Sequence, residues 1–338
     1  MKKTLTAMAV AAVLAAPMAA SADATVYGKV NAAVSQKTMF GADAAWSSDI
    51  SSSKGTNVGV KGSNETELLD FSAVYKFEMG MNADNTYAQR DTWVGLSSNS
   101  LGTVRVGAMK TSYKTSGAYL DIFWDTEVQA ANDLRIMSNQ LHGGTGDGRG
   151  RQTNTIQYTS PTVAGATLNV DYNMIAAGSD NLGVGVHFKN GPVLAFVDYV
   201  SLPGKGKDGS DLTATKVGGK FTAGDVAVGV QYEIDGGAIN KDATSKAKSN
   251  TLFTNVSYTM GATTLTASYG MQDENASGAK DGHTAYVVGA MHSIAKTTAL
   301  YAAYGSATGD DLWGDGMKKK AIADDTSTIL TFGMQQSF

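Results

Sequence analysis

Residues Phe71-Ser-Ala-Val-Tyr-Lys-Phe-Glu78 alternate between two kinds of side chain. Successive side chains of a β-strand point to opposite sides, so this stretch predicts a strand with one apolar and one mainly polar face. The apolar face carries Phe71, Ala73, Tyr75 and Phe77. The other face carries Ser72, Val74, Lys76 and Glu78.

The same alternation recurs from Ala24 to the end of the chain, and clusters of Gly, Asn, Asp and Ser separate the repeats. This is typical of antiparallel strands joined by turns. It predicts an all-β chain of about sixteen strands spaced by roughly 20 residues, with no composition break that would indicate a second domain. The further stretches are 26–31, 58–61, 90–96, 103–107, 151–158, 168–173, 184–188, 193–199, 216–221, 226–232, 251–258, 263–269, 285–292, 298–304 and 329–338.

Alternation alone permits two folds, a soluble sheet protein with a dry core or a membrane barrel with its apolar face toward lipid. Small, glycine-dotted strands such as 184–188 supply few bulky residues for a dry core. Polar faces that meet across a wide interior are stable when water fills it, as in a large barrel. Tyrosines near the predicted strand ends are typical of an aromatic girdle, although tyrosine also favours any half-buried sheet. They are Tyr158, Tyr172, Tyr199, Tyr232, Tyr258 and Tyr269.

Residues 1–22 have the pattern of a secretory signal peptide, with Lys2 and Lys3, an apolar run and the cleavage site Ala20-Ser-Ala22. The apolar run is rich in alanine and interrupted by Pro17, so an anchoring helix is the weaker reading. We therefore expect residues 23–338 to form the mature domain. No later apolar run is long enough for a spanning helix, so a membrane-spanning chain would cross as strands.

The charge of the mature chain argues against a nucleic-acid partner. Removal of Lys2 and Lys3 from 27 basic residues leaves 25 against 31 acidic residues, a formal charge of −6. Cysteine is absent, although an exported chain meets an oxidising compartment. Stability must therefore come from extensive backbone pairing or from a large core.

Residues 112–150 interrupt the strand pattern. They contain an acidic and aromatic segment, Ala118-Tyr-Leu-Asp-Ile-Phe-Trp-Asp-Thr-Glu-Val128, and then a glycine-rich one, Gly143-Gly-Thr-Gly-Asp-Gly-Arg-Gly150. A connection this long inside a domain is uncommon unless it is functional. We predict that it folds into the lumen of a transmembrane, antiparallel, up-and-down β-barrel and constricts it.

At this point the chain resembles the general bacterial porin family, the trimeric, sixteen-stranded diffusion channels of Gram-negative outer membranes. The resemblance covers residues 25–338, and the order and spacing of four stretches make it specific. These are Thr25-Val-Tyr-Gly-Lys29, Val58-Gly-Val-Lys-Gly-Ser63, Val94-Gly-Leu96 through Leu101-Gly-Thr-Val-Arg-Val-Gly107, and Asn154-Thr-Ile-Gln-Tyr-Thr-Ser-Pro161. The chain end, Phe332-Gly-Met-Gln-Gln-Ser-Phe338, resembles the terminal strand whose last aromatic residue, here Phe338, addresses such proteins to the barrel-assembly machinery.

The resemblance implies an outer-membrane porin for passive diffusion of ions and small hydrophilic solutes. It also implies a homotrimer in contact with outer-membrane lipids and lipopolysaccharide, without a cofactor or metal. Acids of the inward loop would face bases of the barrel wall across a water-filled gap, and rows of charges of this kind set selectivity in pores. The loop acids would be Asp121, Asp125, Glu127 and Asp133. The wall bases would be Lys29, Lys61, Lys76, Arg90, Arg105 and Arg151.

One departure concerns the strand before the loop. Relatives often carry Gly-Arg there, whereas this chain has Gly107-Ala108 followed by Lys110. The basic row is therefore either one residue short or completed by Lys110, which leaves the ion preference open. Two basic clusters, Lys205-Gly-Lys207 and Lys318-Lys-Lys320, are expected in outer loops near lipopolysaccharide phosphates.

Three other functions remain possible from the residues. The histidines, His142, His187, His283 and His292, show neither metal-ligand spacing nor a nucleophile motif, so we predict no enzyme; a barrel hydrolase would need His187 near a serine. A sugar-selective porin would need a line of aromatic residues along the lumen, for which Tyr119, Phe123 and Trp124 are candidates. A secreted, soluble β-sheet binding protein is the third possibility.

Overall fold

The computed structural model describes residues 23–38, 45–51, 54–82, 86–131, 134, 136–143, 150–175, 180–206, 209–238, 250–273, 282–309 and 326–338. Within them, seventeen strands form one sheet. The strands are β1 (Thr25–Thr38), β2 (Ala45–Asp49), β3 (Asn57–Glu65), β4 (Phe71–Met81), β5 (Tyr87–Ser98), β6 (Gly102–Lys110), β7 (Arg151–Thr159), β8 (Ala166–Asn173), β9 (Asn181–Asn190), β10 (Val193–Leu202), β11 (Leu212–Ala223), β12 (Val226–Gly236), β13 (Thr251–Met260), β14 (Thr263–Gln272), β15 (His283–Ala295), β16 (Thr298–Gly309) and β17 (Thr326–Ser337).

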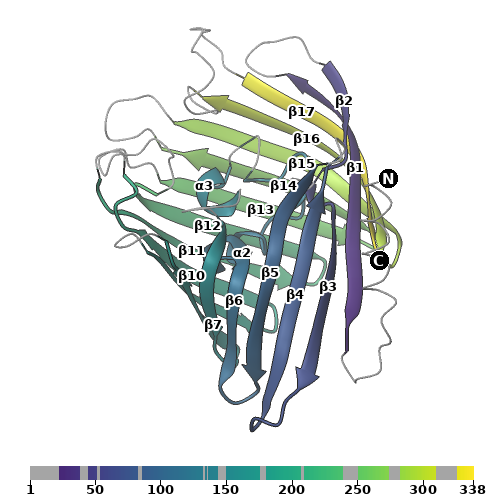
Figure 1. Ribbon diagram of the computed structural model, residues 1–338. Coiled ribbons are helices and arrows are strands. Elements are labelled where there is room, and N and C mark those ends of the chain that lie inside the picture. Colours follow the sequence, from purple (N-terminus) through teal and green to yellow (C-terminus); the bar gives the residue numbers. More distant parts are fainter. Residues whose placement is uncertain are drawn as a thin grey trace, which may run out of the picture.

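The sheet closes on itself as an antiparallel barrel (Figure 1). From β3 to β17 each strand pairs with the next, and β17 pairs with β1 in the register Ala33 with Gly333. Both β2 and β3 pair with β1, at Ser35 with Ser47 and at Tyr27 with Gly59. They therefore make one barrel strand with an interruption, and the predicted sixteen-stranded barrel is confirmed.

Both ends of the described chain lie at the same end of the barrel. The Gly28 amide donates to the Phe338 carbonyl over 3.0 Å, and the Phe338 amide returns a bond of the same length. A side chain at position 28 would place its Cβ 2.3 Å from the Phe338 ring, so the glycine makes room for that ring. Short connections such as 191–192 join strands at this end, whereas residues 111–150 connect strands at the other. In outer-membrane barrels the short turns face the periplasm.

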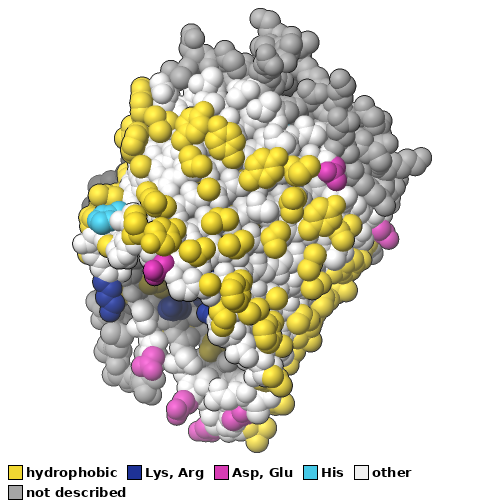
Figure 2. Space-filling view, turned by 180° about the vertical axis from the view of Figure 1, so that it is seen from behind, with side chains coloured by type: hydrophobic (Ala, Val, Ile, Leu, Met, Phe, Trp, Pro, Cys, Tyr) yellow, Lys and Arg dark blue, Asp and Glu magenta, His cyan; other side chains and the backbone are white. Residues whose placement is uncertain are grey.

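The apolar side chains point outward and the polar ones inward, as β12 shows. Val228, Val230 and Ile234 are exposed, whereas Gln231 and Glu233 are fully buried. Hydrophobic side chains are spread over the outer wall in Figure 2, and charged ones lie mainly near its margins. Five of the six tyrosines expected in a girdle are exposed on this surface, namely Tyr172, Tyr199, Tyr232, Tyr258 and Tyr269. The outer surface is therefore suited to contact with lipid.

The described residues of the stretch 112–150 fold into the barrel, as predicted. They contain two short helices, α2 (Ser112–Gly117) and α3 (Asn139–His142), visible inside the barrel in Figure 1. These are the two α-helices in the described part of the chain, and neither is long or apolar enough to cross a bilayer. A hydrophobic cluster fastens the loop to the wall of β10, β13 and β15 to β17. Its larger members are Leu120, Phe123, Leu134, Ile136 and Met137 from the loop and Phe196, Phe253, Val287, Tyr301 and Ile329 from the wall.

Some predicted features lie outside the described residues. They are the signal peptide of residues 1–22, the loop acid Asp133, and the basic residues Lys207 and Lys318 to Lys320.

Candidate functional site

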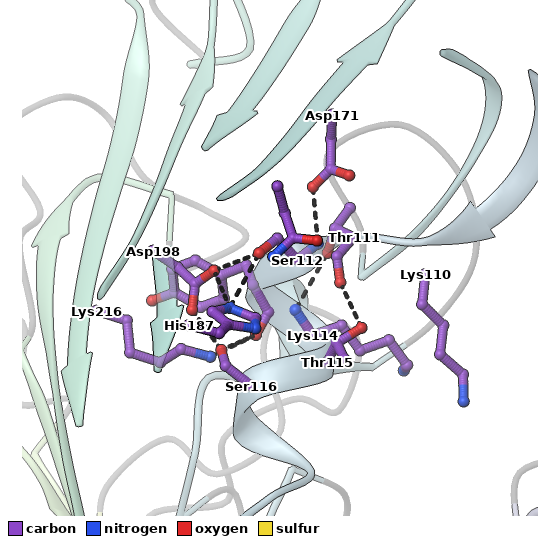
Figure 3. Close-up of polar contacts among 12 residues, drawn as sticks. Lys110, Thr111, Ser112, Lys114, Thr115, Ser116, Asp171, His187, Asp198 and Lys216 are labelled. Carbon is purple, nitrogen blue, oxygen red and sulfur yellow. Dashed lines mark hydrogen bonds and ion pairs between the residues drawn. The ribbon is translucent and has the colours of Figure 1, made fainter. Parts of the chain in front are cut away.

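Helix α2 is held on the barrel wall by buried carboxylates (Figure 3). The Ser112 amide donates to Asp171 over 2.7 Å, and the Ser112 hydroxyl donates to Asp198 over 2.6 Å. The Ser116 hydroxyl also donates to Asp198, and Thr111 caps the helix by accepting from the Lys114 amide. The first turn of the loop is therefore bonded to β8 and β10 through side chains that a strand pattern places toward the lumen.

A second, deeper network joins both helices to β11 and β12. The Tyr113 hydroxyl donates to Glu233 over 3.1 Å, and the Lys216 ammonium donates to the Tyr113 carbonyl. Lys216 also lies 3.0 Å from His142 Nε2. Burial, together with Lys216, holds the pKa of His142 well below its ordinary value, so this imidazole is neutral and accepts from the ammonium.

The hydrolase alternative required His187 near a serine, and the structure does bring Ser112, His187 and Asp198 together. However, His187 Nε2 faces both partners, at 3.1 Å from Ser112 Oγ and 3.0 Å from Asp198. A nucleophilic triad needs one ring nitrogen for the serine and the other for the carboxylate. Here Ser112 donates directly to Asp198 instead, so the three residues anchor the loop and lack the geometry of a catalytic relay.

Two of the predicted loop acids form ion pairs with lysines of the wall. Asp125 contacts Lys29 over 2.5 Å, and Glu127 contacts Lys37 over 2.5 Å and Lys54 over 2.9 Å. Burial on its own would raise the pKa of each carboxyl. Lys29 nevertheless holds the pKa of Asp125 below its ordinary value, and Lys54 with Lys37 does the same for Glu127, so both acids are ionised.

Acids of the wall itself bind further bases. Glu78 contacts Arg90 over 2.5 Å, and Asp91 contacts Lys76 over 2.9 Å and Arg151 over 2.8 Å. A register shift between β4 and β5, after Phe77, brings these side chains together. We call this whole set the paired rim. Its members are Lys29, Lys37, Lys54, Lys76, Glu78, Arg90, Asp91, Asp125, Glu127 and Arg151.

The paired rim differs from the expected arrangement of charges. Loop acids and wall bases were expected on opposite sides of a water-filled gap, whereas Asp125 and Glu127 touch their lysines directly. Lys37, Lys54, Glu78 and Asp91 are members that the sequence pattern does not single out. Glu78 occupies a polar position of its predicted strand, but Asp91 directly follows Arg90, so alternation alone would send Arg90 and Asp91 to opposite faces. Both Glu78 and Asp91 are buried at the register shift, and the register identifies their partners.

Three described residues of the predicted site lie outside the paired rim, namely Asp121, Lys61 and Arg105. Asp121 is buried inside the loop, where it accepts from the Phe123 amide over 2.9 Å and from the Ala130 amide over 2.8 Å. Burial raises the pKa of Asp121 to about 7 in spite of these bonds. Its carboxyl therefore closes the loop on itself. Lys61 is exposed, with its ammonium 5.2 Å from the centre of the Tyr27 ring.

A cavity of about 830 Å³ lies beside the loop. Five Lys and Arg side chains line it, namely Lys76 of the paired rim together with Arg105, Lys110, Lys189 and Lys220, and we call it the basic cavity. Lys76 is paired with Glu78 and Asp91, but in the described part of the chain no carboxylate lies within ion-pair distance of any of the other four. Ala108 supplies no basic side chain, but Lys110, two residues later on the same strand, lines the cavity.

Two of these cations are hydrogen-bonded to neutral groups. Arg105 donates to the Gln157 side chain over 2.9 Å and to Thr159 over 3.2 Å, and Lys220 donates to the Tyr119 carbonyl over 2.7 Å. The one acid among the cavity's described lining residues is Asp91, which already belongs to the paired rim. Among the described residues, no group of three or more His, Asp or Glu side chains is suited to a metal ion.

The amino-acid sequence matches a known protein family. The model of the Gram-negative porin family matches residues 7–312. The major outer membrane protein P.IB of Neisseria gonorrhoeae is 29% identical over 219 residues, which span 60% of this chain and 57% of that protein. P.IB of Neisseria lactamica is 24% identical over 363 residues, covering 100% of both.

Solved structures agree on the fold. An anion-selective porin from Comamonas acidovorans has a TM-score of 0.75 at 19% identity and covers 94% of this chain and 100% of its own. Salmonella typhi OmpF, solved with daunomycin, has a TM-score of 0.70 at 14% identity and covers 93% and 97%. The trimer form of Vibrio cholerae OmpT has a TM-score of 0.65 at 16% identity and covers 94% and 100%. The closed barrel, the infolded loop and the family match together show that this chain belongs to the Gram-negative porin family.

Proposed function

We propose that this protein forms a water-filled channel for passive diffusion of ions and small hydrophilic solutes, with a preference for small anions. Membership of the porin family locates it in the outer membrane of a Gram-negative bacterium and among channel proteins, not among enzymes. The observation that carries the anion preference is the basic cavity, where four cations lack a carboxylate partner among the described residues.

The charge balance of the two regions supports this preference. The paired rim holds six basic side chains against four carboxylates, so its ion pairs leave an excess of two positive charges. The basic cavity adds Arg105, Lys110, Lys189 and Lys220. A water-filled passage lined by one sign of charge concentrates counter-ions, and here these are anions.

The preference is tested by the zero-current potential of the purified protein in planar bilayers. With a tenfold gradient of KCl, we expect a potential with the sign set by chloride, larger at low ionic strength because salt screens the wall charges. A potential with the sign set by potassium, or none at all, would contradict the proposal.

The loop acids Asp125 and Glu127 are proposed constriction residues together with Lys29, Lys76, Arg90 and Arg151. Asp121 is left out because its carboxyl is buried in the loop. The sugar-channel alternative receives no support, because Phe123 is buried in the hydrophobic cluster and Lys114 lies over the Trp124 ring at 5.6 Å. Tyr119 is the one of the three aromatic candidates that lines the basic cavity.

The assembly is proposed to be a homotrimer in contact with outer-membrane lipids and lipopolysaccharide. Trimeric forms among the similar structures support this state. Native mass spectrometry of detergent-extracted protein should give three chains, and bilayer currents should rise in steps of three. A monomer in both measurements would contradict it.

Two further features of the chain ends are proposed from the sequence. Residues 1–22 are a signal peptide, so N-terminal sequencing of the exported protein should begin at Asp23. Phe338 serves as the signal for the barrel-assembly machinery, so deletion of Phe338 should lower the amount of protein in the outer membrane. Its ring is 62% exposed at the end of the last strand, where another protein can reach it.

A further inference from the structure

The basic cavity has apolar faces that passage of a small inorganic anion does not require. Trp93, Tyr119 and Leu194 line it together with the lysines and Arg105. Pockets that bind small organic molecules combine such apolar surfaces with a few polar groups, and have volumes of about 300–1,000 Å³. The volume of this cavity, about 830 Å³, lies in that range.

On one wall, a tryptophan and an arginine from neighbouring strands are in contact. In the ladder of β5 and β6, Trp93 lies opposite Gly107 and Arg105 lies opposite Gly95, so each large side chain faces a glycine. Gly107 has φ +145°, and a Cβ there would lie 3.0 Å from Trp93 Cβ. The guanidinium carbon of Arg105 is 5.2 Å from the centre of the Trp93 ring, a cation–π contact.

On another wall, two lysines flank a leucine. Lys189 on β9 pairs with Leu194 on β10, and Leu194 pairs in turn with Lys220 on β11. The hydrogen bond from Lys220 to the Tyr119 carbonyl keeps this ammonium beside the loop aromatic. Cation and apolar surface are therefore neighbours on both walls.

We propose that the basic cavity is a binding site for aromatic monocarboxylates. The aromatic ring packs against Trp93, Tyr119 or Leu194 while the carboxylate contacts Arg105, Lys189 or Lys220. This assignment rests on the proposed anion-preferring channel and names a solute class for it. A chloride or phosphate ion gains nothing from the apolar surfaces, and a neutral sugar has no charge to complement the cations. Binding is weak and reversible, since a conducting site must release its solute.

The test is block of chloride current by benzoate in planar bilayers containing the full-length mature protein. Acetate has the carboxylate without the ring, benzamide has the ring without the charge, and cyclohexanecarboxylate has an apolar ring without aromatic electrons. We expect the half-blocking concentration of benzoate to be about tenfold below that of acetate, which corresponds to about 1.4 kcal/mol. Benzamide should not block, and cyclohexanecarboxylate should fall between acetate and benzoate.

Variants assign the effect to this cavity. Trp93→Ala should raise the half-blocking concentration of benzoate about fivefold and leave that of acetate unchanged, as expected for loss of one aromatic contact. Trp46→Ala is the matched control, because Trp46 is 55% exposed on the outer face of β2, and it should change neither value. Arg105→Lys keeps the charge and removes the planar guanidinium. It should weaken benzoate block about threefold even if Trp93→Ala does not assemble.

The outcomes separate this inference from the channel proposal. If the zero-current potential follows chloride but benzoate blocks no better than acetate, the cavity is a charge site only and the inference is wrong. Equal block by cyclohexanecarboxylate and benzoate would also overturn the aromatic class. A zero-current potential that follows potassium would instead overturn the anion-preferring channel itself.

Discussion

The paired rim and the basic cavity are built from the same kinds of residue and differ in their electrostatics. Both place lysine and arginine on inward-facing strand positions next to the infolded loop. In the paired rim, Glu78, Asp91, Asp125 and Glu127 lie within 2.5–3.0 Å of these bases. In the basic cavity, the neighbours of Arg105 and Lys220 are an amide, a hydroxyl and a carbonyl. A count of basic residues along the chain therefore does not give the field that a permeating ion meets.

The difference has a simple physical consequence. An ion pair in contact with water contributes little stability, but its opposite charges nearly cancel at a distance. A cation that is hydrogen-bonded to neutral groups keeps its full charge and acts over about 10 Å at 0.1 M salt. We therefore expect the rim to set the geometry of the passage and the cavity to set its ion preference.

The largest effect should come from detaching the infolded loop from the wall. The loop contributes residues to both the paired rim and the basic cavity. Phe123 is 1% exposed, and its ring centre lies 6.5 Å from that of Tyr301. Phe123→Ala should cost about 3 kcal/mol of packing. The loop should then leave the wall intermittently, and single-channel currents should become larger and noisier. Phe332→Ala is the matched control. Phe332 is 49% exposed on the outer face of the barrel, so its replacement should not increase the current noise. Currents of Phe123→Ala that match the wild type would contradict the proposed anchoring.

The second-largest effect should come from reversing the charge of the basic cavity, which tests whether the cavity or the paired rim sets the ion preference. The double variant Arg105→Glu with Lys220→Glu should reverse the sign of the zero-current potential, with a change of about tenfold in the ratio of chloride to potassium permeability, or about 1.4 kcal/mol. Lys296→Gln, on the exposed turn between β15 and β16, is the control for loss of one positive charge and should leave the ratio unchanged. A cavity variant that remains anion-preferring would place the selective charges in the rim.

A third effect concerns the pH dependence of loop docking. Burial raises the pKa of Asp121 to about 7 in the docked loop, from an ordinary value of 3.8. Between these values the docked state binds more protons than a solvated loop, so docking weakens as pH rises and its extra stability is lost on passing pH 7. From pH 6 to pH 7 the loss should be at most about 1 kcal/mol. Current noise should therefore increase over this interval in the wild type and stay constant in Asp121→Asn. The same pH response in both proteins would exclude Asp121 as its origin.

The smallest effect should come from removing one loop carboxylate of the paired rim, which tests how much that ion pair contributes to ion selectivity. Asp125→Asn removes the partner of Lys29 and should make the channel more anion-preferring, by about 0.5 kcal/mol because one ion pair in water is weak. Asp121→Asn should leave selectivity unchanged at pH 8, since its carboxyl is enclosed by the loop. The zero-current potential in a KCl gradient checks both variants. Equal shifts for the two would show that the loop acids act alike, as the resemblance to porins implied.

Much of the barrel follows from local pattern. The alternation in stretches such as 71–78 and 226–232 is a property of a few neighbouring residues, and it correctly predicted strands with an apolar outer face and a polar inner face. The break in that alternation at residues 112–150 correctly located the infolded loop. The pattern does not reveal the anchors Asp171, Asp198, Lys216 and Glu233, because an inward-facing charged residue looks the same in sequence whether it meets water or a helix.

The amino-acid sequence by itself determined the strand period, the direction of each face and the place of the loop, since these depend on side chains two residues apart. Only the tertiary structure decided which charges neutralise one another. Asp121 and Asp125 are four residues apart in one loop and have the same chemistry, yet one accepts backbone amides and the other contacts Lys29. Strand register and loop docking bring together groups far apart in the chain, and an ion pair depends on distances of a few ångströms that local pattern does not specify.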